Sequence, residues 1–199
     1  MRLSSPIRHL CSSLSLSRAR GAILGLGLLL LGQSCGEEII SRRYCDLPAR
    51  FSYSPVSAVS QLYTSCNSMG QWCTILATSS QFVFSNPEGS TPVARTAVTN
   101  YTGFYMGLSG FIVGLPSIPE MGSDYPVVTC YDLACRNCYE EQYVTKPLTL
   151  HASGTATCPK CQRTYDLNNQ GIVSQGDPGK SLYRYRVSYG NNTLAINNR

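Results

Sequence analysis

The stretch from Cys130 to Asp166 reads CYDLACRNCYEEQYVTKPLTLHASGTATCPKCQRTYD, and it holds two Cys-x-x-Cys pairs separated by 19 residues. This spacing is typical of two loops that converge on one tetrahedral metal ion. Between the pairs, β-branched and apolar residues at 143–145, 148–150 and 155–157 are interrupted by Pro147 and Gly154, which predicts short strands and not a helix. The sequence therefore predicts a metal site with the ligands Cys135, Cys138, Cys158 and Cys161.

A longer pattern surrounds the two cysteine pairs. It consists of Cys158-Pro159, Tyr165-Asp166, Gly171, Gly176, Pro178, Leu182, Tyr185 and Val187. This run resembles the second ligand box and tail of the Rieske [2Fe–2S] domain family, and residues 131–138 resemble its first box, with Cys135 in the cysteine position. Asn137 and Cys161 stand where that family has its two histidine ligands. The resemblance has real motifs over 130–187 and is looser over 62–197.

The histidine count limits what the resemblance implies. The chain has two histidines, His9 and His151, and His9 lies in a leader that we expect to be removed. A Rieske centre needs two histidines on one iron, so the ordinary two-Cys two-His centre is excluded. The resemblance then implies a divergent member, a one-electron carrier in which four cysteines hold a [2Fe–2S] cluster of low potential.

Two alternatives to an iron–sulfur cluster stay open for the four cysteines. Thiolates bind Zn²⁺ equally well, and the protein would then be a non-redox structural zinc-ribbon module that acts in binding or interaction. The pairs could instead form disulfides, because an exported chain meets oxidising conditions. Thiol–disulfide exchange is disfavoured because the predicted strand–loop–strand offers no helix N-terminus to activate a thiolate.

Residues 1–34 are typical of an export signal. They carry four arginines, no acidic residue and an apolar run of about a dozen residues, shorter than the ~20 that span a bilayer. The end of the run, Leu31-Gly32-Gln33-Ser34-Cys35, resembles a bacterial lipoprotein cleavage site. We therefore expect a lipidated Cys35, a tether over 35–50, and a protein anchored to a bacterial membrane, periplasmic or at the cell surface.

Charge and motif content exclude several classes of function. The net charge is +5, but removal of the leader leaves 12 basic and 11 acidic side chains, a net charge of +1, which does not favour nucleic acid. The chain shows no nucleophile–base motif, so we predict no enzyme, no catalytic residue and no small-molecule substrate. Expected partners are the membrane, through the anchor, and a redox protein. Export without a twin-arginine signal favours zinc, which is acquired after crossing.

From Phe51 onward the pattern predicts strands. They are expected at 51–53, 72–77, 81–84, 93–99, 111–113, 127–129 and 183–189, and the last joins 193–196 as a closing hairpin. Residues 56–68 alone suit a short helix. The predicted fold class is all-β: an antiparallel, Rieske-like β-sandwich over 51–199 with a small rubredoxin- or zinc-ribbon-like metal-binding subdomain at about 128–168.

Other residue groups have two interpretations each. Cys45, Cys66, Cys73 and Cys130 suit stabilising disulfides or buried thiols, or alternatively a fifth metal ligand or a redox relay. His151 suits a strand side chain with its tip in water, or a replacement ligand. The glycine–aromatic run over 101–120 suits a docking loop or metal cover, or a glycine-kinked strand pair.

Four carboxylates lie near the cysteine pairs without forming an acid–base pair. Asp166 has a structural position, and Glu140-Glu141 suits a solvated loop. These four are Asp132, Glu140, Glu141 and Asp166.

Overall fold

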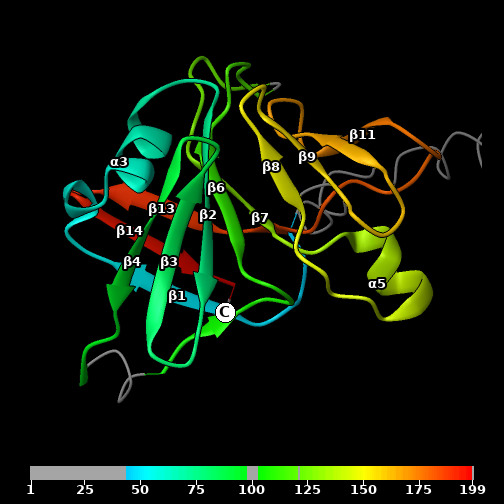
Figure 1. Ribbon diagram of the computed structural model, residues 1–199. Helices are drawn as coiled ribbons and strands as arrows, with labels where there is room; N and C mark the ends of the chain where they lie inside the picture. Colours follow the sequence, from blue (N-terminus) through cyan, green and yellow to red (C-terminus); the bar gives the residue numbers. More distant parts are fainter. Residues whose placement is uncertain (1–43, 98–102, 121, 199) are drawn as a thin grey trace, which may run out of the picture. The chain divides into compact units, whose positions relative to one another are not determined.

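The computed structural model describes residues 44–97, 103–120 and 122–198 (Figure 1). The predicted leader and Cys35 lie outside the described residues, as does the tether up to residue 43. Within the described part of the chain, no helix is long and apolar enough to cross a bilayer. Its strands form three antiparallel sheets, and with 41% strand against 13% helix the fold is mostly β, as the sequence predicts.

The largest sheet has the order β12-β7-β6-β2-β3-β4. Its strands, in chain order, are β2 (Gln71–Ala77), β3 (Gln81–Asn86), β4 (Gly89–Ala94), β6 (Phe111–Leu115), β7 (Thr129–Asp132) and β12 (Arg184–Tyr185). The Asn86 side chain closes the β3–β4 turn by accepting from the backbone N–H groups of Glu88 and Gly89. The strand predicted at 93–99 overlaps β4 only at Val93 and Ala94, because β4 begins at Gly89 and ends at Ala94, and residues 98 and 99 lie outside the described residues. Pro92 is tolerated because β4 is an edge strand.

A second sheet has the order β13-β14-β1-β5. Its strands are β1 (Ala49–Tyr53), β5 (Tyr105–Met106), β13 (Val187–Gly190) and β14 (Thr193–Asn197). The two residues between β13 and β14 are Asn191 and Asn192, with φ of 48° and 57°. Two positive φ values are what a type I′ turn needs, and asparagine adopts them readily. The predicted closing hairpin is therefore confirmed.

Alternation along the six-stranded sheet creates two hydrophobic cores. Cys73, Val113 and Cys130 are register partners and lie in the first core, which also contains the inward residues of β1 and β14. Their neighbours Trp72, Ile112 and Tyr131 lie in the second core, with cysteines of the two pairs. Because successive side chains of a strand point to opposite faces, the same three strands serve both cores. Side chains from both the six-stranded sheet and the second sheet make up the first core.

The short helices lie at one side of the first core. η1 (Val56–Ala58) leads into α3 (Ser60–Asn67), which buries Leu62 and Cys66 at helical spacing. This agrees with the predicted helix at 56–68. The described part of the glycine–aromatic run, 103–120, holds β5 in the second sheet and β6 in the largest sheet, so the two strands do not pair with each other. Phe104 and Met106 pack on the first core. A side chain at Gly107 would collide with the Tyr185 hydroxyl and the Asp132 carboxylate, so the tight turn after β5 requires glycine.

The third sheet is small and follows helix α5 (Arg136–Gln142) (Figure 1). Its order is β11-β10-β9-β8, with β8 (Thr149–His151), β9 (Thr155–Thr157), β10 (Thr164–Asp166) and β11 (Ile172–Gln175). The strands predicted at 148–150 and 155–157 are confirmed as β8 and β9 within one residue. The strand predicted at 143–145 is wrong, because Tyr143 ends α5 in the left-handed conformation, with φ of 55°.

Candidate metal centre

A buried carboxylate fixes the backbone that leads to the first cysteine pair. Asp132 ends β7, and its Oδ1 accepts from the Ala134 N–H at 2.7 Å. Its Oδ2 accepts from the Leu108 N–H at 2.8 Å and from the Tyr185 hydroxyl at 2.5 Å. Burial raises the pKa of Asp132 to about 6, although these hydrogen bonds lower it. Asp132 is thus a structural acceptor, and no second carboxylate faces it among these contacts.

The first cysteine pair lies at the start of a helix, contrary to the prediction of strands without a helix. Cys135 is the N-cap of α5, and its Sγ accepts from the Cys138 N–H at 3.5 Å. A thiolate at this position satisfies one of the free N–H groups of the first turn. Arg136 and Glu140 add an ion pair at i, i+4 spacing. The helix therefore forms although it has only seven residues.

The second cysteine pair lies in the hairpin loop between β9 and β10. The Cys158 N–H donates to the Arg163 carbonyl at 2.9 Å, and the Gln162 N–H donates to the Cys158 carbonyl at 3.0 Å. Gln162 has a φ of 61°, so the chain reverses direction directly after Cys161. The Lys160 N–H points at the Cys158 sulfur, 3.4 Å away. Both loops therefore aim backbone N–H groups at sulfur, which stabilises thiolates.

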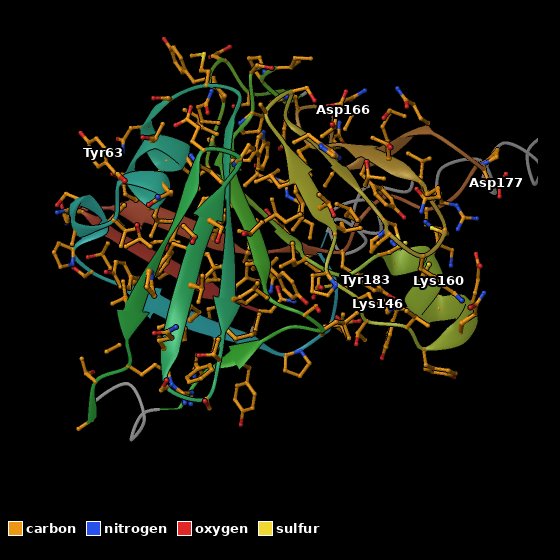
Figure 2. All side chains as sticks on the ribbon, in the orientation of Figure 1. Tyr63, Lys146, Lys160, Asp166, Asp177 and Tyr183 are labelled. Atoms are coloured by element: carbon orange, nitrogen blue, oxygen red, sulfur yellow. The ribbon has the colours of Figure 1, made fainter. Side chains whose placement is uncertain are left out.

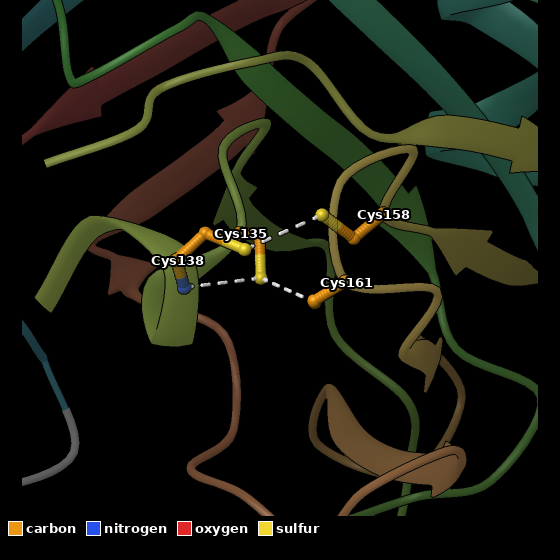
Figure 3. Close-up of side chains that lie close together, drawn as sticks. All are labelled: Cys135, Cys138, Cys158 and Cys161. Atoms are coloured by element: carbon orange, nitrogen blue, oxygen red, sulfur yellow. Dashed lines mark hydrogen bonds between the residues drawn. The ribbon is translucent and has the colours of Figure 1, made fainter. Parts of the chain in front are cut away.

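The four predicted ligands come together at one point (Figure 3). The four Sγ atoms lie within 4.8 Å of one another, and the Cys135–Cys161 and Cys138–Cys158 Sγ pairs are each 3.7 Å apart. Cys135, Cys138 and Cys158 are buried, whereas Cys161 is partly exposed. The two sulfurs of a disulfide lie about 2.05 Å apart. The four cysteines are therefore free thiols, and the alternative in which the cysteine pairs form disulfides does not hold.

The electrostatics of the four sulfurs are unequal. Burial raises the pKa of Cys135, and burial together with the neighbouring cysteines raises the pKa of Cys138. For Cys161 burial acts in the same direction, but the hydrogen bonds from the Arg163 backbone and the other cysteines prevail and lower its pKa to about 7. A divalent cation bound between the four sulfurs would stabilise every thiolate at once, so the thiols would lose their protons to solvent as the metal binds.

Tyr165 and Asn137 are further residues of the site, although the sequence assigned them no contact with sulfur. The Tyr165 hydroxyl lies 2.9 Å from the Cys135 Sγ and accepts from the Asn137 side-chain amide at 2.9 Å. Residues 163, 165 and 167 are all buried, which is the alternation of one strand face. In the sequence, only the polar Asp166 between Tyr165 and Leu167 hints at this alternation. Asn137 carries no such signal.

The remaining polar residues near the site have structural contacts. His151 is exposed in β8, and its Nε2 lies 3.0 Å from the Thr157 Oγ1, so it is a strand side chain with a polar partner. Asp166 accepts from the Asn168 N–H. Glu140 is in α5 and not in the predicted loop, and Lys180 and Tyr183 donate to it. These interactions, of which the hydrogen bond from Lys180 has the largest effect, lower the pKa of Glu140 to about 2. Tyr183 is labelled in Figure 2. Glu141 pairs with Arg163.

Four further cysteines in the described residues are free thiols. Burial raises the pKa of Cys66 to about 11, and it also raises the pKa values of Cys45, Cys73 and Cys130. Cys66, Cys73 and Cys130 belong to the first core, and Cys45 packs against it. Cys66, Cys73 and Cys130 are therefore buried thiols and Cys45 is a partly exposed one, and none of the four forms one of the disulfides that were the alternative.

Comparison with known proteins identifies no relative: no family model, no curated protein and no solved structure matches this chain. The four-cysteine geometry is consistent with a metal-binding protein.

Proposed function

We propose that this protein binds a single tetrahedral metal ion through Cys135, Cys138, Cys158 and Cys161, and that the ion is Zn²⁺. The separation of the sulfurs carries this proposal. Four ligands about 2.3 Å from one ion lie about 3.8 Å from one another, which agrees with the two 3.7 Å contacts. A [2Fe–2S] cluster places its irons between two ligand pairs, so sulfurs of different pairs lie about 5 Å or more apart. No two of the four cysteine sulfurs lie more than 4.8 Å apart, which is less than a [2Fe–2S] cluster requires.

The ion would act as a cross-link within the small subdomain. It would join the loop that begins α5 to the loop between β9 and β10, and the strands of that sheet have only three or four residues each. Such short strands give little stability by themselves. Structural zinc contributes roughly 10–16 kcal/mol in zinc-finger peptides. The protein is then a non-enzymatic binding or interaction module whose metal-bearing end is rigid.

A [2Fe–2S] one-electron carrier is the second candidate, and hydrogen bonding to the sulfurs favours it. Cys135 receives the Cys138 N–H and contacts the Tyr165 hydroxyl, and Cys158 receives the Lys160 N–H. Hydrogen bonds to sulfur are one means by which proteins set the potential of such clusters. The resemblance to the Rieske family supports this candidate as well. The four cysteines would hold the cluster, and partly exposed Cys161 would face a redox partner.

We also propose that the protein is exported and anchored through a lipidated Cys35. The basic and apolar leader supports this placement, and the membrane is then the first partner. Mass spectrometry of the N-terminal peptide from cell-derived protein tests it. The expected peptide begins at Cys35 and carries the mass of attached acyl chains, whereas an unprocessed Met1 or a peptide without lipid would reject the anchor.

Metal analysis and an optical spectrum separate the two candidates. The sample is protein from its native compartment, isolated without refolding. One zinc per chain and no visible absorption are expected, and Cys158→Ser should abolish the zinc while Cys73→Ser, in the first core, keeps it. Two irons with matching sulfide and a colour that bleaches on reduction would instead establish the cluster. No metal in the wild-type chain would reject both candidates.

A further inference from the structure

Asn137 is a buried polar residue between two ligands, and its side chain bonds a distant loop. The Lys180 N–H donates to the Asn137 Oδ1 at 2.9 Å, and the Asn137 Nδ2 donates to the Lys180 carbonyl at 2.9 Å. Asn137 is 5% exposed. A side chain at Gly179 would collide with this amide, so the loop backbone packs directly on it. The residue is thus held from two sides.

The contacts with Lys180 fix which end of the amide points where. A backbone N–H can only donate and a carbonyl can only accept, so exchange of the amide oxygen and nitrogen would place two donors against each other and two acceptors against each other. The Nδ2 group therefore faces the Lys180 carbonyl with one hydrogen. Its second hydrogen points to the Tyr165 oxygen, 2.9 Å away.

This orientation determines the direction of the Tyr165 hydroxyl. Because the Tyr165 oxygen accepts from Asn137, its own hydrogen is free for the other neighbour, the Cys135 Sγ at 2.9 Å. Tyr165 is fully buried, so water does not compete for that hydrogen. A contact this short suits a charge-assisted hydrogen bond to a thiolate. The chain of donors runs from Lys180 through Asn137 and Tyr165 to the sulfur.

We propose that Asn137 is a positioning residue of the metal centre, which orients the Tyr165 hydroxyl as a donor to the Cys135 thiolate. The inference rests on the proposed metal binding by the four cysteines. Four thiolates around a divalent cation carry a net charge of about −2, and a donor that spreads part of this charge stabilises the loaded site. Asn137 thereby acts on the ion through Tyr165, without being a ligand.

Asn137→Asp tests this direction because it keeps the shape of the side chain and reverses one end of it. The carboxylate still accepts from the Lys180 N–H, but it cannot donate to the Lys180 carbonyl or to Tyr165. The Tyr165 hydroxyl then donates to that carboxylate in place of sulfur. Tyr165→Phe removes the same O–H···S bond directly. Asn168→Asp is the matched control, because the Asn168 Oδ1 only accepts, from Trp72 and from the Ser117 N–H, and a carboxylate keeps both bonds.

Co²⁺ is the probe, measured by competition with a chelator and by its sulfur-to-cobalt charge-transfer band. Asn137→Asp and Tyr165→Phe should each weaken Co²⁺ binding about 10- to 100-fold and shift the band alike, and the double variant should lose no more than either single one. Asn168→Asp should bind as the wild type. Losses that multiply in the double variant would show that the introduced carboxylate acts through its charge alone and would overturn the inference, as would wild-type affinity in both single variants.

A measurement on the unaltered sequence covers the case in which a variant does not fold. In ¹¹³Cd-loaded wild-type protein, the buried Tyr165 hydroxyl proton should give a slowly exchanging resonance that correlates with ¹¹³Cd across the hydrogen bond to sulfur. Its absence would overturn the inference while metal binding stands. A wild-type protein that binds neither Co²⁺ nor Cd²⁺ would instead refute the proposed function itself.

Discussion

Protonation of Asp132 should change the stability of the folded protein in a direction opposite to that of an ordinary surface carboxylate. The group is fully buried, and burial raises its pKa from 3.8 to about 6. The folded state therefore binds the proton more tightly than the unfolded state does. The stabilisation that comes from the proton on Asp132 is complete below pH 3.8 and is lost as the pH rises through about 6.

The size of the effect follows from the two pKa values. At about 1.4 kcal/mol for each pKa unit, the free energy of unfolding should fall by about 3 kcal/mol between about pH 3.5 and pH 7 because of this one group. Asp132→Asn removes the titration and keeps an acceptor for one N–H. The difference in unfolding free energy between wild type and variant cancels the other groups and the metal, which titrate in both.

Urea unfolding at several pH values, followed by tryptophan fluorescence, measures this difference. The wild type should lose about 3 kcal/mol relative to Asp132→Asn as the pH rises across this range. A difference that does not vary with pH would mean that Asp132 has the same pKa in both states. A wild type that gains stability relative to Asp132→Asn as the pH rises would mean that the hydrogen bonds from Leu108 and Tyr185 outweigh burial. Either result would refute the reasoning.

Three further perturbations address other parts of the structure. Removal of the metal by a chelator under reducing conditions should abolish hydrogen-exchange protection of amides in β9 and β10 while β2 and β6 keep theirs, and uniform protection in both states would contradict a cross-linking ion. Gly114→Ala should destabilise the fold by about 1–3 kcal/mol in thermal unfolding, because the new methyl group collides with the Gln71 carbonyl and the Trp72 ring; an unchanged melting temperature would contradict this packing. Glu140→Gln should cost less than about 1 kcal/mol near neutral pH, because its ion pairs are partly exposed. That cost should vanish as the pH falls from 4.5 to about 2, where the wild-type carboxylate is protonated too, and urea unfolding at both ends of this range checks it.

Spacing and alternation were sufficient to predict the four cysteines and most strands. Two close cysteine pairs constrain the chain locally, so their convergence follows from short-range geometry. The Asn191-Asn192 turn is equally local, because two positive φ values suit asparagine. The short distances among the four sulfurs confirm the convergence, whereas the family resemblance stays a prediction.

Features that depend on distant partners were not predictable. Helix α5 is too short to show helical periodicity, and its N-cap is a thiol and not a usual capping side chain. The partner of Asn137 is Lys180, 43 residues away, and only the folded chain brings the two together. The start of the strand predicted at 93–99 was misplaced because pattern alone did not show that Pro92 lies within an edge strand.

X-ray absorption at the metal edge of protein isolated from its native compartment tests the central claim most directly. A single ion in a four-thiolate site predicts zinc with about four sulfur neighbours at about 2.3 Å and no second metal nearby. Iron with a second iron and bridging sulfides in its near shell would contradict the single-ion site, and so would zinc bound by oxygen or nitrogen in place of the four sulfurs.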